Sequence, residues 1–434
     1  MPAPVRCLFA ALAIACVTSC IQDYEILPER PDVDPGEVTS CPFSAVEGTR
    51  FSSYDCNPVF SGTDAAWETS VGAVGYLVTE VLAHPFIQIW YLGASGDDFG
   101  MGYAITANGT DWETHPSNPV FTREAGAWDE DSVSAQVVVW DPVDMQYVMA
   151  YQGYSLNDPT DSADDIWGIG VTTSLDGVTW EKHPDNPVID FGQYGLQVYD
   201  YWNYFCNERA SDPVICDLIG WAYTTDYTLS SSLHPCWPLT MRITERGGFR
   251  GYLAAQDTLE ILEGLDWESF EADLWAGESA SVQTDEYAAC NVYRMDGIEL
   301  DGWLLWEDEP VLAGTTGGPD GKGVTGAAVV ELGAVQYMFY LGFEEWIPST
   351  GGLISANNST LHIARSYDEG ITWELDPNNP VPLHRTQDKQ LWGVGAQVVG
   401  TRIYVWLSDI YDQGRAVGYF YYEPDLEEVH PSSE

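Results

Sequence analysis

Pairs of short apolar segments, separated by a few polar residues, recur along this sequence. Segments of this length that are rich in Val, Ile, Tyr and Phe are typical of β-strands, and the short gaps between them predict hairpins. Three such pairs are 137–140 with 147–151, 329–331 with 337–341, and 398–399 with 403–407. The pattern therefore predicts an all-β fold built from meandering strands.

A more specific signal follows the strand pairs: a turn of Asp or Asn and Gly that leads into a tryptophan. Its three copies end at Trp112, Trp180 and Trp373, and each continues to an Asn-Pro-Val segment. The Asx side chain is expected to accept hydrogen bonds from turn amides, while Gly takes the positive φ. The tryptophan is expected to pack between neighbouring sheets. A fourth Asn-Pro-Val, at 57–59, opens the body of the chain.

Four strands per unit, repeated every 60–70 residues or so, predict a β-propeller with long loops. Repeat units are clear near 57–117, 118–185, 309–378 and 379–425. Residues 186–308 are degenerate and could hold one elaborated blade or two. The prediction is therefore five blades, with six as the alternative.

The N-terminus resembles a bacterial lipoprotein signal. A mostly apolar run from Cys7 to Val17 is too short to span a bilayer and ends at Val17-Thr18-Ser19-Cys20, which is similar to a lipobox. We expect a signal peptide over 1–19, a lipid on Cys20, and an acidic, proline-rich disordered tether over 20–40. The propeller is expected over 41–425 and a C-terminal tail over 426–434. Ile21 and Gln22 after the cysteine favour the outer membrane.

Charge narrows the range of partners. The chain carries 67 acidic residues against 16 Lys and Arg, for a formal net charge of −51. Nucleic acid is excluded as a class of partner, because phosphate binding needs a basic face. Membrane association is expected only through the lipid anchor, with the protein a monomer in the cell envelope that faces the periplasm or the exterior.

Cysteine usage agrees with export. Without Cys7, Cys16 and the lipid-bearing Cys20, six cysteines remain, an even number that fits three disulfides in an oxidising compartment. Proximity favours the pairings Cys41–Cys56, Cys206–Cys216 and Cys236–Cys290 among the fifteen that six cysteines allow.

The repeats resemble those of the five-bladed propeller glycosidases, the arabinanase, invertase and levansucrase-like superfamily. The resemblance lies in the Gly-x-x-x-Ser-x-Asp-Gly-x-x-Trp segment at 170–180, in Asn-Pro-Val, and in Trp128-Asp129. It implies carboxylates on the innermost strands of the first three blades, since glycoside cleavage needs two carboxyl groups at a fixed separation.

Only one of the three expected inner-strand acids is present. The expected inner strand of the third blade keeps an acid, Asp212, with Glu208 just before it. The corresponding segments of the first and second blades, residues 71–74 and 134–136, contain no acid. Asp212, Glu208 and Asp129 are therefore the catalytic candidates. Glu68, Glu130 and Asp131 also precede the first two inner strands, although with 67 acids a solvated surface is the simpler interpretation.

Two function classes follow. The first is a surface lipoprotein whose aromatic-rich propeller (18 Trp and 25 Tyr) binds extracellular carbohydrate or an envelope protein without catalysis. The alternative is a glycoside hydrolase or phosphorylase acting on an extracellular polysaccharide. The segment 366–373 also resembles the Asp-box of six-bladed sialidases, which bind a carboxylate with three arginines. Candidates for these are Arg209, Arg242, Arg246, Arg250, Arg294 and Arg365.

No cofactor is expected. The acidic loop at 157–165 has oxygen ligands of the kind that calcium prefers, but it lacks the spacing of a defined calcium motif. No metal site is predicted.

Overall fold

The computed structural model describes residues 41–190, 233–257 and 289–425, apart from short gaps within these ranges. The signal peptide, Cys20, the tether and the tail from residue 426 lie outside the described residues, as do Asp212 and Glu208. Those assignments therefore stay predictions. No helix of the described residues is long and apolar enough to cross a membrane.

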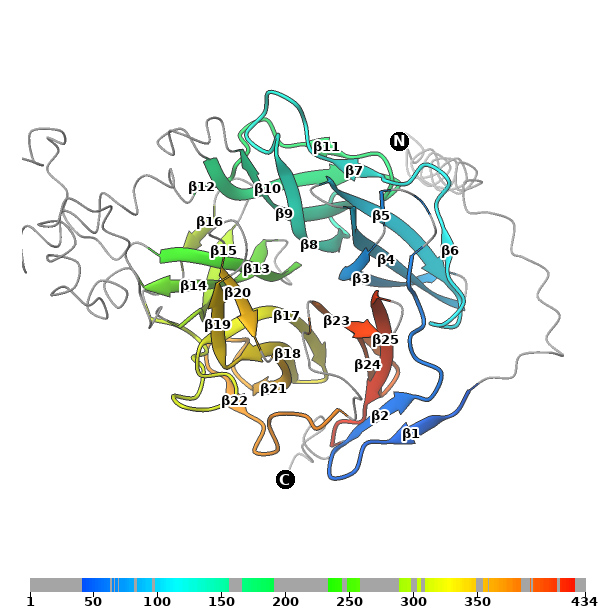
Figure 1. The fold of residues 1–434 in the computed structure, drawn as a ribbon, viewed down its shortest axis with the longest axis vertical. Coiled ribbons are helices and arrows are strands. Elements are labelled where there is room, and N and C mark those ends of the chain that lie inside the picture. The colour runs from blue at the N-terminus through cyan, green and yellow to red at the C-terminus, as the bar shows by residue number, and fades with distance from the viewer. Residues whose placement is uncertain are drawn as a thin grey trace, which may run out of the picture. The chain divides into compact units, whose positions relative to one another are not determined.

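Five antiparallel sheets form a ring (Figure 1). The fold is a five-bladed β-propeller. The first blade has the strands β3 (Ser70–Val81), β4 (His84–Ser95), β5 (Asp98–Thr106) and β6 (Glu113–Thr114), with β7 (Phe121–Thr122) also on β5. The second has β8 (Ser132–Asp141), β9 (Gln146–Ser155), β10 (Ile166–Ser174) and β11 (Glu181–Lys182), with β12 (Ile189–Asp190) on β10.

The degenerate part of the sequence contributes a single described blade. This third blade has β13 (Leu233–Ile243), β14 (Phe249–Asp257), β15 (Asn291–Gly297) and β16 (Trp303–Leu305). The fourth has β17 (Gly323–Leu332), β18 (Val335–Phe343), β21 (Thr360–Ser366) and β22 (Glu374–Leu375), and a hairpin of β19 (Glu345–Pro348) and β20 (Ile354–Asn357) precedes β21. Five blades are confirmed, and the six-bladed alternative is wrong.

The last blade is closed by the start of the body. Strands β23 (Gly393–Val399), β24 (Arg402–Tyr411) and β25 (Gly414–Tyr422) pair with β2 (Phe51–Tyr54), which pairs with β1 (Phe43–Ala45). Because N-terminal strands complete the C-terminal sheet, the ring has no open seam. A closed ring of sheets leaves only short edges exposed.

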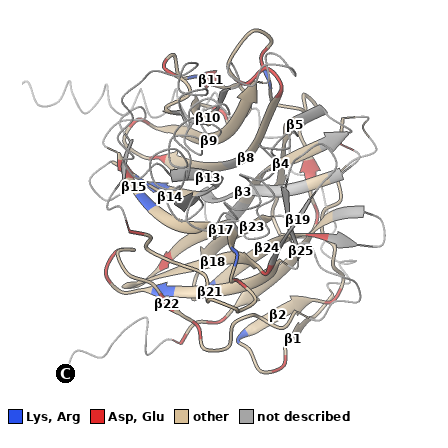
Figure 2. Ribbon diagram, turned by 60° about the vertical axis from the view of Figure 1, so that its left-hand side comes forward, with Lys and Arg blue, Asp and Glu red and all other residues tan. Residues whose placement is uncertain are grey.

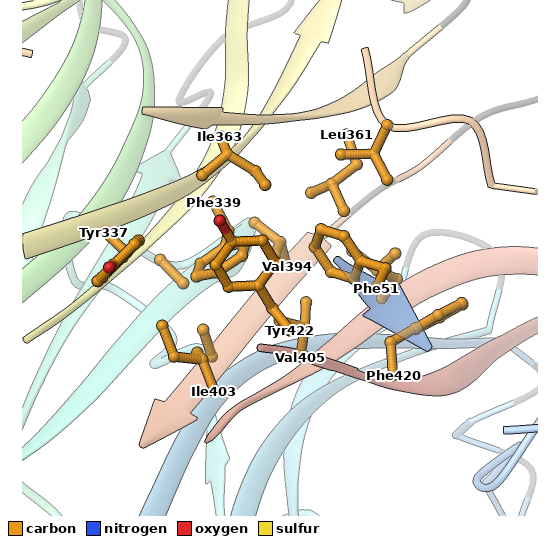
Figure 3. Packing of buried hydrophobic residues seen from close by; sticks show 14 of the residues in the cluster. Phe51, Tyr337, Phe339, Leu361, Ile363, Val394, Ile403, Val405, Phe420 and Tyr422 are labelled. Atoms are coloured by element: carbon orange, nitrogen blue, oxygen red, sulfur yellow. The ribbon is translucent and has the colours of Figure 1, made fainter. Parts of the chain in front are cut away.

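Each seam between neighbouring blades holds one hydrophobic cluster. Five separate clusters occupy the five seams of the ring. In the seam between the fourth and fifth blades, Phe51 of β2 packs edge-on against Phe339 and lies beside Tyr422 (Figure 3). The core of the protein is thus distributed radially, and the blades are held together mainly by apolar burial.

The Asx–Gly turns join each blade to the one before it. In the second blade, Asp176 Oδ1 accepts hydrogen bonds from the backbone amides of Val178 and Thr179. The carbonyl of Gly177 (φ 76°) accepts a 2.7 Å bond from the indole Nε1 of Trp90, which belongs to the first blade. The equivalent turns of the first and fourth blades lie against Tyr419 and Tyr252, in the fifth and third blades.

The tryptophans after these turns are wedged into the seams, as predicted. Trp180 lies edge-on against Trp90 at a centroid distance of 6.2 Å, and Trp373 lies edge-on against Tyr252 at 5.8 Å. Trp112 lies 5.8 Å from Phe60. Both the turn and the tryptophan are therefore architectural parts of the propeller.

The Asn-Pro-Val segments clasp the third strand of a blade. The side chain of Asn118 accepts a bond from the backbone amide of Tyr103 (2.8 Å) and donates one to its carbonyl (3.1 Å). Asn57 makes the same two bonds with Tyr419 of β25, at 2.7 and 3.1 Å. The first Asn-Pro-Val therefore completes the fifth blade, which corrects the prediction that it opens the first unit.

The cysteine prediction is supported in part. Cys41, Cys56 and Cys290 are disulfide-bonded. Cys206 and Cys216 lie outside the described residues, and so does the side chain of Cys236. The connectivity stays a prediction.

Candidate functional site

The innermost strands of the blades are β3, β8, β13, β17 and β23, and each contacts the next around the ring. We call the face where these strands begin the upper face. Because neighbouring strands are antiparallel, the second strand of each blade ends at this upper face. The third strand ends at the opposite face, so the Asx–Gly turns that follow it lie on that opposite face. The upper face is therefore the end of the ring where long linkers between blades can surround a central site.

Three buried carboxylates precede inner strands at this face. Each accepts a hydrogen bond from a tyrosine hydroxyl on the second strand of its blade. The pairs are Glu68 with Tyr91 (2.7 Å), Asp129 with Tyr151 (3.0 Å) and Asp320 with Tyr340 (2.9 Å). Burial, the largest cause, and the neighbouring carboxylate raise the pKa of each tyrosine well above its usual value, so the hydroxyls stay protonated donors.

Local sequence makes room for these acids. In each of these blades a glycine on the second strand faces the acid and leaves space for its side chain. A Cβ on Gly93 would lie 3.0 Å from the Cβ of Glu68, and one on Gly153 would lie 2.7 Å from the Cβ of Asp129. Gly342 lies in the same way below Asp320. The acids are therefore part of a repeated structural motif in the first, second and fourth blades.

In two blades the linker asparagine joins this network. The amide Nδ2 of Asn118 donates to the hydroxyl of Tyr91 (3.0 Å), and that of Asn186 donates to the hydroxyl of Tyr151 (3.4 Å). A carboxylate, a tyrosine and the Asn-Pro-Val clasp are thus connected within one blade. Satisfied polar networks of this kind fix the geometry of a buried region.

Asp129, a predicted catalytic residue, is completely buried and has an additional cationic partner. Its Oδ2 accepts a 2.7 Å hydrogen bond from Lys182 Nζ of β11 as well as that of Tyr151. Lys182 also lies 3.3 Å from Glu124. These contacts are those of a buried ion pair. The catalytic role of Asp129 stays a prediction.

Asp320 has a histidine neighbour where the first two blades have glycine. His362 pairs with Tyr340 across β21 and β18, the position of Gly102 and Gly170 in their blades, and its ring stacks on Tyr340 at 5.0 Å. Its Nε2 lies 2.8 Å from the hydroxyl of Thr360. Burial lowers the pKa of His362 to about 4, and the nearby Asp320 carboxylate opposes that shift.

This buried imidazole predicts a pH dependence of stability. The pKa of His362 is lower in the folded protein than its ordinary value of about 6.5, so the unfolded chain binds more protons between about pH 4 and 6.5. The free energy of unfolding should therefore fall as the pH drops through this window. Denaturant unfolding at several pH values should show a shallower fall for His362→Gln. Identical slopes for both proteins would contradict the assignment.

The inner strands carry irregularities near the upper face. Register shifts interrupt β3 between Ala73 and Gly75, β8 between Ser134 and Val137, and β17 between Val324 and Gly326. The residues inserted there are Val74, Ala135 with Gln136, and Thr325. Bulges often lie beside active sites, but none of these three described bulges carries an acid.

The innermost described strand of the third blade is β13, which begins about twenty residues after Asp212 in the sequence. Asp212 and Glu208 lie outside the described residues, so their role and their position relative to Asp129 stay predictions.

The arginines proposed as a sialidase-like triad have acidic partners wherever they are described. Arg250 and Arg294 share the carboxylate of Asp296, Arg242 pairs with Glu331, and Arg365 pairs with Asp376. Arg209 and Arg246 lie outside the described residues. The described arginines therefore serve as ion-pair partners within and between blades.

Sequence reasoning missed three residues of the upper-face network: Asp320, Lys182 and His362. A spacing could have revealed the first. Before each of the three upper-face acids a Pro-Val pair is followed directly by a buried apolar residue, and the acid comes eight residues after that one. The apolar residues are Phe60, Phe121 and Leu312, and the acids are Glu68, Asp129 and Asp320. No local signal identifies Lys182 or His362, because their partners lie 53 and 42 residues away.

Asp and Glu positions among the described residues are spread over several blades (Figure 2). Among the described residues, no three His, Cys, Asp or Glu side chains come together as a metal site requires. The acidic loop at 157–165 lies outside this part of the chain.

No family model and no curated protein matches this chain. Solved structures do. A glycoside hydrolase structure is similar at 13% identity over 85% of this chain and 91% of its own, with a TM-score of 0.51. A structure of BT0996 described as an RGII complex is similar at 13% identity over 84% and 91%, with a TM-score of 0.50. The GH32 β-fructofuranosidase BmSUC1 of Bombyx mori has 12% identity over 83% and 61%, with a TM-score of 0.47.

The chain is a five-bladed propeller and shares its fold with the first two of these structures. At such identities the likeness establishes the fold and no more. The resemblance inferred from the repeats is therefore confirmed for the fold.

Proposed function

We propose that this protein is a carbohydrate-active enzyme, a glycoside hydrolase or phosphorylase that acts on an extracellular polysaccharide at the upper face of the ring. The observation that carries this proposal is the extent of the fold match. The propeller corresponds to 91% of the length of a glycoside hydrolase structure and of a structure named as an RGII complex. A match over nearly the whole of both chains favours a complete carbohydrate-active propeller.

The chemistry requires two carboxyl groups, one to protonate the leaving oxygen and one to attack or to activate the nucleophile. The described bulges of β3, β8 and β17 carry no acid, and the three upper-face acids are bound by tyrosines. We therefore assign the reacting carboxyls to Asp212 and Glu208, which precede β13 in the sequence.

The test is a turnover screen with aryl-glycosides and plant, fungal and bacterial polysaccharides, with and without inorganic phosphate. Wild type should release sugar, and Asp212→Asn and Glu208→Gln should each reduce turnover to background. Glu374→Gln is the matched control, because Glu374 is an exposed acid on an outer strand. Phosphate-dependent release would identify a phosphorylase. Equal turnover in wild type and Asp212→Asn would end the assignment.

A second candidate is non-catalytic binding of carbohydrate or of an envelope protein. The observation that favours it is that Asp129 is already neutralised by Lys182 and hydrogen-bonded by Tyr151. Such a group offers no free carboxylate to a substrate. Binding on a glycan array with no turnover of any bound glycan would support this candidate over the enzyme.

We also propose that a lipid on Cys20 anchors the propeller at the outer membrane. The supporting observation is the Val17-Thr18-Ser19-Cys20 segment after an apolar run. Cys20→Ala should move the protein from the membrane fraction to the soluble fraction. Unchanged membrane association would contradict the anchor.

A further inference from the structure

A polar groove lies at the outer edge of the seam between the first two blades. It is an open depression of about 680 Å³ between the linker that contains β7 and strand β11. This volume lies within the ~300–1,000 Å³ typical of small-ligand sites. Aromatic lining comes from Phe121 and Trp180, and charged lining from Arg123, Glu124, Glu181 and Lys182.

Three of the four charges of this groove, Arg123, Glu124 and Lys182, are not part of the blade repeat. At the equivalent linker positions of the first blade, Gly62 and Thr63 stand in place of Arg123 and Glu124. At the equivalent position of the outer strand, Thr114 and Leu375 stand in place of Lys182 in the first and fourth blades. The tryptophan and the glutamate after it are shared by the three blades, so this seam is distinguished by Arg123, Glu124 and Lys182.

The lining has the chemistry of a sugar site. The half-buried ring of Trp180 is an apolar surface of the kind on which the C–H face of a sugar stacks. The exposed carboxylates of Glu124 and Glu181 can accept hydrogen bonds from sugar hydroxyls.

Charge selects the kind of sugar. Lys182 is already bound by Asp129 (2.7 Å) and lies 3.3 Å from Glu124, so its charge is compensated. The guanidinium of Arg123 donates to the carbonyl of Glu130. The chain as a whole carries a net charge of −51, which repels polyanions. A neutral chain of sugars is therefore favoured over one of uronic acids.

We propose that this groove is a binding site for a neutral oligosaccharide segment, separate from the central site. The inference rests on the proposed function, because it supplies the same polysaccharide with a second point of attachment on the side of the ring. Two attachment points raise the effective concentration of the substrate at the catalytic centre.

The experiment is a titration of the protein with cellohexaose, xylohexaose, mannohexaose, arabinohexaose and hexagalacturonate, followed by tryptophan fluorescence and calorimetry. At least one neutral hexasaccharide should bind and change the fluorescence, and hexagalacturonate should bind at least about tenfold more weakly. Glu124→Gln with Glu181→Gln should weaken the neutral ligand about tenfold, since charged acceptors form the stronger hydrogen bonds. Trp180→Phe, which keeps an aromatic wedge, should abolish the fluorescence change.

Glu113→Gln is the matched control. Glu113 precedes Thr114 on the outer strand of the first blade as Glu181 precedes Lys182, and the affinity of this variant should equal that of wild type. The proposal is overturned if no neutral hexasaccharide binds, if hexagalacturonate binds as tightly, or if the double variant binds like wild type. Turnover of a short aryl-glycoside should be unchanged in the double variant. Turnover by wild type without groove binding would overturn this inference alone, and groove binding without turnover would overturn the enzyme assignment alone.

Discussion

Replacing Lys182 by methionine is expected to lower the free energy of unfolding by about 3–5 kcal/mol. The reason is the burial of its partner. Asp129 is 0% exposed, and Lys182 Nζ is the cation on its Oδ2, at 2.7 Å. Without the ammonium group the carboxylate would keep only the hydroxyl of Tyr151, because its Oδ1 meets no donor among the described residues.

Chemical denaturation followed by tryptophan fluorescence measures this loss. The double variant Lys182→Met with Asp129→Asn should recover much of the stability, because the amide removes the unpaired buried charge. The matched control is Arg402→Met, which breaks an ion pair with Glu423 whose side chains are both about half exposed. That change should cost about 0–1 kcal/mol. An unfolding free energy of Lys182→Met equal to that of Arg402→Met would show that Asp129 is not held as a buried charge.

Phe51→Ala is expected to lower the free energy of unfolding by about 3–5 kcal/mol, as truncation of other fully buried aromatic residues does. Phe51 is 1% exposed and lies at the centre of the cluster between the fourth and fifth blades (Figure 3). It packs edge-on against Phe339, with ring centroids 6.0 Å apart, and its ring is tilted against that of Tyr422 at 5.2 Å. Truncation leaves a cavity and also loosens the strand that closes the ring.

Unfolding by denaturant again provides the measurement, with limited proteolysis of the N-terminal hairpin as a second observable. Leu175→Ala is the control, because this leucine is 74% exposed and its loss should change the stability by less than about 0.5 kcal/mol. The Phe51→Ala variant should be cut more rapidly between β1 and β2 than wild type. Unchanged stability and unchanged cleavage would mean that β2 does not hold the ring closed.

Much of the fold could be predicted because its signals are local. The turn at Asp176 and Gly177 is held by hydrogen bonds to amides two and three residues away, so its sequence and its geometry coincide. Trp180 follows Gly177 by three residues, and the same spacing separates the turn glycine from the tryptophan in the other two copies. Repetition of these short signals indicated blades, and a propeller is the fold that such repeated four-stranded units form.

The candidate site was less accessible to prediction. Asp129 was singled out as a possible catalytic acid, because its sequence neighbours resemble those of the glycosidases. The contacts that define it come from Tyr151 and Lys182, which are 22 and 53 residues away. Asp212 and Glu208 stay predictions for the same reason, since the role of an acid depends on what surrounds it.

The sequence by itself determined the blade repeat, the Asx–Gly turns and the seam tryptophans, because interactions within a few residues encode them. Only the tertiary structure decided that five blades close the ring and that Asn57 clasps Tyr419, 362 residues further along the chain. It also decided that Glu68, Asp129 and Asp320 are buried beside tyrosines. The physical reason is that ring closure and charge burial depend on packing between distant segments, which no local pattern of residues specifies.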